Sequence, residues 1–312
     1  MRFALMVEPQ QGMGYADLLA IAQTAEEEGF EAFFRSDHYT SFPGPHGLRT
    51  TDCWATLAGL ARETSRIRLG SLVSPVTFRV PGAFAKTAAT VDEMSGGRIE
   101  LGVGAGWNEL EHHELGIPYP SDKVRVDMLE EELRLFHGLW GEPDGWTMEG
   151  EHIRVGGTHF RPRDRRPPII VGGTGRPRSV RLAATFADEH NLSSATPAHA
   201  REVNALLDAA CEKVGRDPQT LTRSAMTGVL VGRTASEVAR RTKAQLAAAG
   251  QEGAGADEWL AARAERWVMG TGAEARDRVA ALEEAGIERV MLQTFLPFDI
   301  DHVRVMAEIF LG

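Results

Sequence analysis

Short apolar runs, rich in β-branched and aromatic residues, alternate along the chain with longer segments whose apolar residues recur at helical spacing. This alternation is typical of parallel strands joined by crossover helices. It predicts eight strands, at residues 3–7, 30–35, 67–73, 99–103, 169–171, 190–193, 225–231 and 290–294. It also predicts a first helix that ends at Gly29, followed by helices at 52–64, 83–94, 122–140, 177–187, 198–214, 235–249, 275–285 and 303–310.

Eight strand–helix units favour an α/β fold of the (β/α)8 TIM-barrel type over an open Rossmann-type sheet, which needs about six strands. A chain of 312 residues could hold two domains, but α/β barrels reach this length as one. We therefore expect a single barrel domain over residues 1–312. Two insertions exceed the repeat. The segment near 141–168 predicts a hairpin. The segment near 251–272 predicts a helix with one face that carries Trp259, Arg263, Arg266 and Trp267. This face could belong to a lid or serve simple packing.

The charge balance narrows the classes of partner. The chain has 34 basic and 44 acidic residues, a net charge of −10 and no basic block. This composition argues against nucleic acid or an anionic membrane surface as a partner. Because no apolar run is long enough to span a membrane and no signal peptide is visible, we expect a cytoplasmic protein. The two cysteines, Cys53 and Cys211, are too few for a disulfide framework or a zinc site.

In a barrel of this type the active site lies at the carboxyl ends of the strands. Glu8 follows the first predicted strand, and Asp37 and His38 follow the second. A histidine there suits acid/base chemistry, because an imidazole titrates near neutral pH and can give or take a proton. The alternative is a structural histidine that bonds a neighbouring backbone group.

Glycines follow the fourth and fifth predicted strands. Gly102, Gly104 and Gly106 are spaced G-x-G-x-G, which differs from the G-x-G-x-x-G of dinucleotide sites and suits a flat ligand lying against small residues. Residues 172–175 form a glycine-rich turn before a helix with Pro177 in its first turn. The free N–H groups of such a helix start favour a phosphate, and the alternative is an ordinary tight turn.

A cluster of acids and histidines follows the fourth strand, namely Glu109, Glu111, His112 and His113. These residue types can hold a metal ion, but adjacent histidines point to different sides of a helix and no third ligand is evident. We interpret the segment as a solvated helix start and predict no metal site.

Several motifs occur together in a fixed order: 34–39 (FRSDHY), 69–79 (LGSLVSPVTFR), 95–98 (SGGR), 101–108 (LGVGAGWN), 168–173 (PIIVGG), 187–188 (AD) and 285–290 (AGIERV). By these motifs the chain resembles the luciferase-like monooxygenase superfamily, and within it the branch of coenzyme F420 (deazaflavin)-dependent oxidoreductases. The resemblance extends over essentially the whole chain. It implies a TIM-type barrel that holds a flavin or deazaflavin in its mouth.

The resemblance also implies roles for individual residues. Asp37 and His38 match the pair near the cofactor ring, and His38 matches the position used for proton transfer. Leu72, Val73 and Ser74 match the strand-three bulge, which often holds a non-proline cis peptide against the ring. The remaining implied cofactor contacts are Ala105, Gly106 and Asn108 after strand four, and Gly172, Gly173 and Thr174 at the cofactor phosphate.

The chain departs from the pattern of the sugar-phosphate-oxidising relatives. Trp107 stands where those relatives have a catalytic glutamate, and Glu109 follows two residues on. No clear set of basic ligands for a substrate phosphate is evident in the later strands. We therefore do not expect sugar-phosphate oxidation, and we keep Glu109 and Glu8 as further catalytic candidates.

The resemblance implies an F420-dependent oxidoreductase that transfers a hydride between the deazaflavin C5 carbon and a small organic substrate. His38 would supply or accept the accompanying proton, and Asp37 would orient His38 or the ring. One alternative is an FMN-dependent luciferase-like monooxygenase supplied by a separate cofactor reductase. Another is a barrel that binds a flavin without catalysis. The family also implies a homodimer.

Overall fold

Eight parallel strands close into a barrel in the computed structural model, which describes residues 1–162, 164–251, 253, 255–296 and 298–312. The strands are β1 (Arg2–Val7), β2 (Ala32–Arg35), β3 (Arg68–Pro75), β4 (Ile99–Gly104), β7 (Ile169–Gly173), β8 (Glu189–Ser193), β9 (Thr222–Val231) and β11 (Arg289–Thr294). Each strand pairs with the next in this order, and β11 pairs with β1 to close the ring. The predicted TIM-type barrel is confirmed and the open Rossmann-type sheet is excluded.

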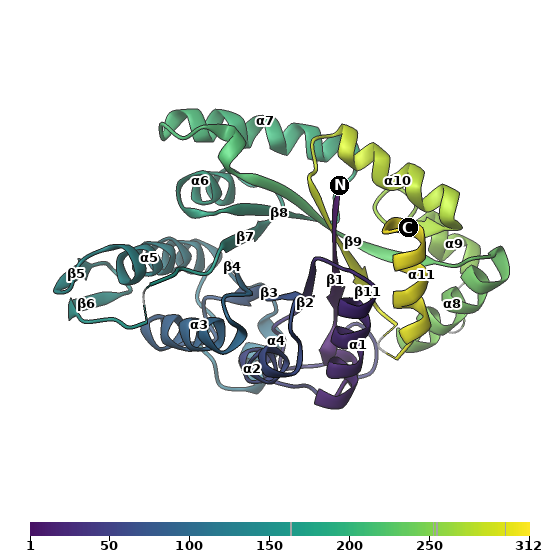
Figure 1. Ribbon diagram of the computed structural model, residues 1–312, viewed down its shortest axis with the longest axis horizontal. Coiled ribbons are helices and arrows are strands. Elements are labelled where there is room, and N and C mark those ends of the chain that lie inside the picture. Colours follow the sequence, from purple (N-terminus) through teal and green to yellow (C-terminus); the bar gives the residue numbers. More distant parts are fainter. Residues whose placement is uncertain (163, 252, 254, 297) are drawn as a thin grey trace.

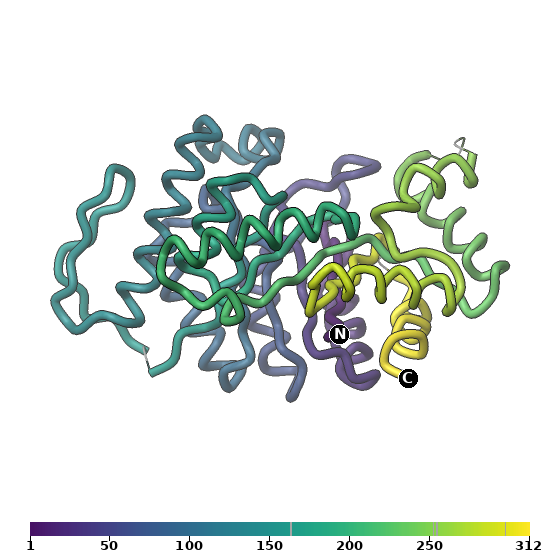
Figure 2. The backbone as a smooth tube through the Cα atoms, turned by 90° about the horizontal axis from the view of Figure 1, so that it is seen from above, coloured from purple at the N-terminus to yellow at the C-terminus, as the bar shows by residue number. Residues whose placement is uncertain are grey.

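Helices surround the barrel, as the helical spacing predicts (Figure 1). They are α1 (Tyr15–Glu27), α2 (Cys53–Glu63), α3 (Pro81–Ser95), α5 (Asp122–Gly141), α6 (Pro177–Phe186), α7 (Pro197–Lys213), α8 (Ala235–Ala248), α10 (Gly272–Glu284) and α11 (Ile300–Phe310). The first and last elements lie side by side (Figure 2), and Phe3 stacks on Phe310 with ring centroids 5.2 Å apart. Within the described part of the chain, no helix is long and apolar enough to cross a membrane.

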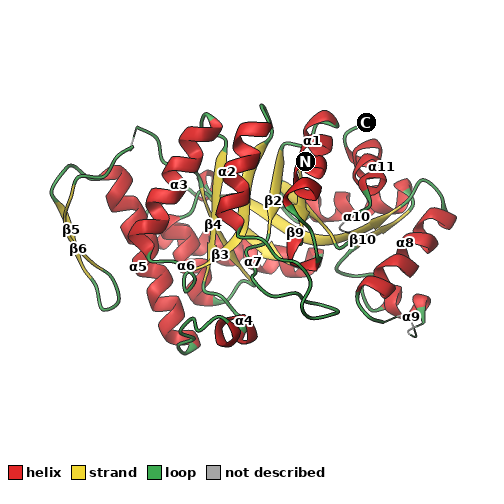
Figure 3. Ribbon diagram, turned by 90° about the horizontal axis from the view of Figure 1, so that it is seen from below, coloured by secondary structure: helices red, strands yellow, loops and turns green. Residues whose placement is uncertain are grey.

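The insertion near 141–168 forms the predicted hairpin. Its strands β5 (Trp146–Glu149) and β6 (Arg154–Thr158) pair antiparallel and extend from one edge of the molecule, away from the barrel (Figure 3). Trp146 fixes it to α5, because its indole lies over Gly138, where a Cβ would overlap the ring. Residues 163, 252 and 254, which fall within the two predicted insertions, lie outside the described residues.

The insertion near 251–272 differs from the prediction. Its helix α9 (Ala256–Ala261) ends at Ala261, and turns lead into the short strand β10 (Val268–Gly270), which pairs with β9. The expectation that Trp259 and Trp267 share one helical face is therefore wrong. The two rings meet nevertheless, edge to face at 5.3 Å, because the turns fold the chain back on itself.

The barrel strands separate two apolar layers. A large cluster fills the space between the strands and the helices, and it includes both buried cysteines. A smaller cluster fills the barrel interior and combines Ala4 and Ala32 with Met6, Phe34 and Met291. At the amino ends of the strands, Arg289 bonds Glu100 (2.6 Å) and Glu189 (3.1 Å) inside the barrel. The opposite end, at the carboxyl ends of the strands, is left for the site.

Candidate functional site

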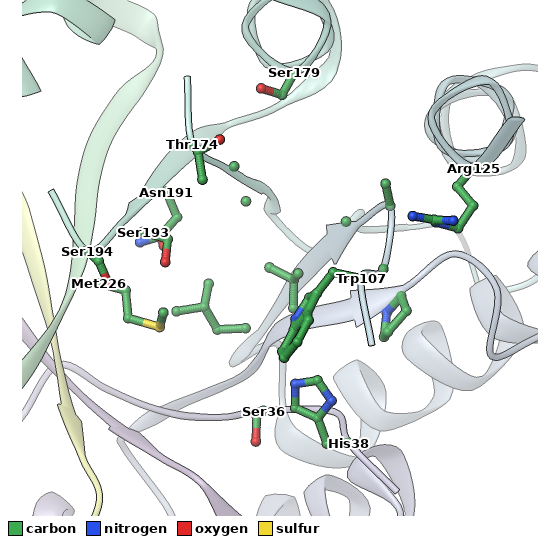
Figure 4. Close-up of a pocket in the computed structure, with 18 of the residues that line it drawn as sticks. Ser36, His38, Trp107, Arg125, Thr174, Ser179, Asn191, Ser193, Ser194 and Met226 are labelled. Carbon is green, nitrogen blue, oxygen red and sulfur yellow. The ribbon is translucent and has the colours of Figure 1, made fainter. Parts of the chain in front are cut away.

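A cavity of about 1230 Å³ opens at the carboxyl ends of the barrel strands. Figure 4 shows His38 and Trp107 on one side of it, Asn191 and Met226 across from them, and Thr174 with Ser179 at a third side. Of the residues predicted as cofactor contacts or catalytic groups, those that line the cavity are Glu8, His38, Leu72, Val73, Ala105, Gly106, Gly172, Gly173 and Thr174.

The wall at β3 is a bulge. The pairing of β3 with β4 shifts register between Ser71 and Ser74, and the peptide bond between Leu72 and Val73 is cis, as the resemblance predicts. Glycines on the neighbouring strands make room for Val73, because a Cβ on Gly104 or on Gly172 would lie 2.7 or 2.9 Å from its methyl groups. Gly104 and Gly172 thus make room for the bulge and also line the cavity, and the contact of the strand-four glycines with a flat ligand stays a prediction.

His38 is held by a glutamate from the segment after β4. Its Nδ1 lies 2.9 Å from Oε1 of Glu111, and Oε2 of Glu111 accepts the backbone N–H of Tyr39 at 3.0 Å. A carboxylate only accepts, so the pair places the proton of neutral His38 on Nδ1. Nε2 is then left as the acceptor. The rings of Phe42 and Trp107 flank the imidazole edge to face, with centroids at 4.5 and 5.8 Å.

Asp37 lies behind the cavity wall. Its side chain is fully buried, accepts from Arg79 Nη1 at 2.5 Å and accepts from the Ser74 hydroxyl at 2.6 Å. Among the described residues, Asp37 bonds Arg79 and Ser74 rather than His38, and neither Asp37 nor Ser74 lines the cavity. The two residues belong to a buried network, which Arg79 extends to Asp52 at 2.7 Å, and their contact with the ring stays a prediction.

This network also acts on the groups around it. Burial, together with the charge of Asp37, raises the pKa of Tyr39, whose hydroxyl donates to Asp52 at 2.8 Å. Burial likewise raises the pKa of Cys53, so this thiol is not activated as a nucleophile. The network fixes the loops after β2 and β3 to each other.

Glu109 is exposed at the start of the short helix α4 (Glu109–Glu114) and does not line the cavity. Asn108 is likewise absent from the described lining, and its carbonyl accepts from Nδ1 of His112 at 2.6 Å. The second nitrogen of His112 accepts from the Thr77 hydroxyl at 2.7 Å. Because these bonds occupy both nitrogens of His112, this residue is unsuited to bind a metal. Across the described residues, no group of three or more His, Cys, Asp or Glu could hold a metal ion.

Glu8 belongs to a hydrogen-bonded chain on the cavity floor. Its carboxylate accepts from the side-chain amides of Gln293 (2.5 Å) and Gln10 (2.6 Å), and Gln10 in turn accepts from the Ser36 hydroxyl at 2.7 Å. All four side chains line the cavity. Two amide donors thus hold the Glu8 carboxylate in place at the cavity, and a catalytic role for Glu8 stays a prediction.

The side at β7 and α6 is rich in hydrogen-bond donors. Gly173 and Thr174 precede α6, whose first helical residue is Pro177, and the Ser179 side chain lies close to Gly173. Arg176 and Lys123 add positive charge to this part of the lining. Lys123 bonds Asp127 at 2.8 Å, whereas no ion pair of Arg176 is found among the described residues. A helix start with nearby cations is suited to bind a phosphate.

Sequence reasoning missed several lining residues. Glu111 follows the strand-four glycines, but only the folded chain shows that it reaches His38 rather than solvent. Gln10 and Gln293 lie near strand ends, which could have marked them as candidates. Arg125 comes from α5 and stacks on the Tyr119 ring at 4.0 Å; no sequence signal placed it at the cavity.

Comparisons with known proteins assign the sequence to one family. The sequence profile of the luciferase-like monooxygenase family matches residues 1–289. The chain is 36% identical over 191 residues to an F420-dependent glucose-6-phosphate dehydrogenase of Nakamurella multipartita, a match covering 60% of this chain and 54% of that relative. The chain thus spans about half the length of that curated relative.

Two solved structures share the fold over nearly their whole length. An F420-dependent secondary alcohol dehydrogenase in complex with an F420–acetone adduct is 20% identical, with a TM-score of 0.85 over 99% of this chain and 98% of that one. The monooxygenase RslO1 from Streptomyces bottropensis is 23% identical, with a TM-score of 0.83 over 100% and 99%. At these identities the likeness shows the fold alone.

Proposed function

The chain belongs to the luciferase-like monooxygenase family, and from this premise we propose that it is a coenzyme F420-dependent oxidoreductase acting on a small organic substrate. The observation that carries the proposal is the His38–Glu111 pair. The pair faces a cavity whose side at β7 and α6 holds hydrogen-bond donors suited to bind a phosphate. The 36% identical relative is named as F420-dependent, which supports the choice of cofactor.

The lining fits a flat ring with a phosphate-bearing chain. Leu72, Val73, Ala105 and Gly106 would contact the ring, and they offer apolar and small groups on the β3 and β4 side. The phosphate would be held at the β7 side by Gly172, Gly173 and Thr174, with Ser179, Arg176 and Lys123 beside them. When bound, the deazaflavin supplies a C5 carbon that gives or takes a hydride.

His38 would move the proton that accompanies the hydride. Glu111 fixes its ring and keeps one proton on Nδ1, so Nε2 accepts a proton from the substrate in one direction and donates it in the other. Glu111 stabilises the imidazolium formed in the first case, because its carboxylate bonds the other nitrogen. Phe42 and Trp107 pack against His38 and limit the access of water to it.

Asp37 has an indirect role in this proposal. Through Arg79 and Ser74 it holds the end of β2 against the β3 bulge, and His38 is the next residue along the chain. It is therefore a positioning residue for His38 and for the wall at Leu72 and Val73. Glu109, exposed and outside the lining, has no role in the proposed chemistry.

The second candidate is an FMN-dependent monooxygenase with a separate cofactor reductase. FMN would place its ring against the same wall at β3 and β4 and its phosphate at the same side at β7 and α6. The protein RslO1, whose structure is similar, is named a monooxygenase. A third candidate is a barrel that binds a flavin without catalysis. The His38–Glu111 pair favours an enzyme over this third candidate, since a binding site alone needs no fixed proton donor. The homodimer and the cytoplasmic location stay predictions.

Parallel binding titrations with F420 and FMN test the proposal. We expect F420 to bind more tightly. Arg176→Gln should weaken F420 binding but leave binding of the phosphate-free deazaflavin chromophore unchanged. Arg201→Gln is a matched control, because Arg201 is exposed on α7, away from the lining. Tight FMN binding without F420 binding would overturn the choice of cofactor.

A further inference from the structure

We propose that the group of the substrate that reacts is a cation, an ammonium in the direction of oxidation and an iminium in the direction of reduction. The inference rests on the proposed function and deepens it, because it names a substrate class for the same cavity. It concerns the part of the cavity that is formed by Glu8, Ser36, His38, Glu111 and Gln293, which we call the acidic end.

Two buried carboxylates give the acidic end its negative charge. Glu8 is 6% exposed and Glu111 is 1% exposed. The groups bonded to them in the described part of the chain are side-chain amides, a backbone N–H and the imidazole of His38. Every lysine or arginine among the described lining residues belongs to α5 or to α6 and its N-cap. The positive charge of the cavity thus lies on the phosphate side, and the carboxylates of the acidic end are left for a cationic ligand.

The hydrogen bonds at the acidic end leave acceptors facing the cavity. Ser36 uses its hydroxyl proton on Gln10, whose amide donates to Glu8. Gln293 also donates its amide to Glu8, and its carbonyl oxygen has no donor among the described residues although the side chain is only 9% exposed. Nε2 of neutral His38 is a further acceptor. A ligand with several donors satisfies these groups, and an ammonium group brings three.

Two aromatic rings beside His38 also favour a cation. The rings of Phe42 and Trp107 meet the imidazole edge to face and lie 5.3 Å from each other. Both residues line the cavity, and Trp107 is 64% exposed, so its indole is accessible to a ligand. The face of an aromatic ring attracts an ammonium group. A carboxylate or a phosphate would instead be repelled by the two carboxylates, and a neutral alcohol would gain nothing from their charge.

A charged nitrogen gives the proposed hydride transfer a balanced course. The ammonium loses one N–H proton to Nε2 of His38, and the amine so formed gives the hydride of its adjacent carbon to the deazaflavin C5. The carbon–nitrogen single bond becomes an iminium double bond, and the two electrons that the amine loses pass to the deazaflavin with the hydride. Because the product is again a cation, Glu8 and Glu111 hold the substrate in both directions.

A matched pair of probes tests the charge preference on the cofactor-free protein, without turnover. Cyclohexylammonium and cyclohexanol carry a cation and a neutral donor on the same ring. Calorimetry should give the ammonium a Kd about 10- to 100-fold below that of the alcohol. The ammonium should also shift the side-chain amide resonances of Gln10 and Gln293 in a ¹⁵N spectrum, because both amides contact Glu8. Equal Kd values for the two probes would overturn the proposal.

Variants locate the cation in the acidic end. Glu8→Gln removes the charge at nearly constant size and should bring the Kd of the ammonium to within about threefold of that of the alcohol. Glu109→Gln is the matched control, because Glu109 is exposed and outside the described lining, and it should leave both Kd values unchanged. If Glu8→Gln fails to fold, Trp107→Leu tests the same site, because this exposed ring should contribute about 2- to 5-fold to the affinity for the ammonium alone.

An ammonium affinity that neither Glu8→Gln nor Trp107→Leu changes would place the cation elsewhere and overturn the proposal. These measurements use no cofactor, so such a result leaves the parallel titrations with F420 and FMN intact. Failure of this inference is therefore distinguishable from failure of the proposed function.

Discussion

His38 and Glu111 stand 73 positions apart in the sequence, yet Nδ1 of His38 lies 2.9 Å from Oε1 of Glu111. The contact forms because the segment after β4 folds over the loop after β2 at the mouth of the barrel. Glu111 is almost fully buried and uses its second oxygen on the backbone N–H of Tyr39. The carboxylate therefore fixes both the tautomer of His38 and the loop that carries it.

We expect Glu111→Gln to lower turnover by about 10- to 100-fold, because the amide no longer stabilises the imidazolium of His38. Cofactor affinity should change little. Glu109→Gln is the matched control, since Glu109 belongs to the same short helix but is exposed. The pH profile of turnover should change in the Glu111 variant alone. Equal losses in the two variants would contradict the role of Glu111 in holding and stabilising the imidazole of His38.

Gly102→Ala should destabilise the protein by about 1–3 kcal/mol, because a Cβ there would overlap the carbonyl oxygen of Ser71 within the β3 bulge. The backbone oxygen cannot rotate away as a side chain can. Gly82→Ala is the control: Gly82 lies in α3 with nothing within 4 Å of an added Cβ, so it should keep or slightly raise stability. Urea unfolding of both variants measures the difference. Equal stabilities would show that the bulge adapts to the methyl group.

Arg289→Met should cost about 3–5 kcal/mol of unfolding free energy, because it leaves Glu189 buried without its cation and leaves Glu100 with Arg68 alone. Burial alone would raise the pKa of Glu100, but Arg289 and Arg68 lower it below its usual value. The comparison is Arg233→Met, which breaks exposed ion pairs with Asp301 and Glu308 and should cost much less. Similar losses in thermal unfolding of the two variants would contradict the importance of burial here.

Acid should weaken the fold through His190. Burial lowers the pKa of this histidine from 6.5 to about 4, so the unfolded chain takes up a proton that the folded chain refuses. The resulting stability is present above pH 6.5 and is lost as the pH falls from 6.5 to about 4, at a rate of at most about 1.4 kcal/mol per pH unit. His190→Gln should make the unfolding free energy less dependent on pH over this window. An unchanged slope would contradict the burial of a neutral imidazole.

The strand and helix pattern predicted the architecture, because the barrel depends on periodicities that are local in the sequence. The eight strands and the hairpin insertion both follow from such patterns. The second insertion was predicted less well. Trp259 and Trp267 meet through a turn, and a turn of that kind leaves no periodic signal in the sequence.

The site was predicted less completely than the fold. The position of His38 and of residues 172–174 directly after predicted strands indicated that they lie at the barrel mouth, and they line the cavity there. Proximity to a strand end could not separate Asp37, which pairs with Arg79, from His38 beside it, nor exposed Glu109 from buried Glu111. These choices depend on contacts between residues tens of positions apart, which a single sequence does not reveal.

The most direct test of the central claim is an anaerobic single-turnover measurement. The protein, loaded with reduced F420, is mixed with a panel of small ketones, imines and enones, and the absorbance of the deazaflavin is followed. We predict that at least one compound reoxidises the cofactor, and that His38→Ala slows this step by about 10²- to 10⁴-fold with nearly unchanged cofactor affinity. The same rate in the His38 variant, or no reaction with any compound while FMN binds tightly, would contradict the account.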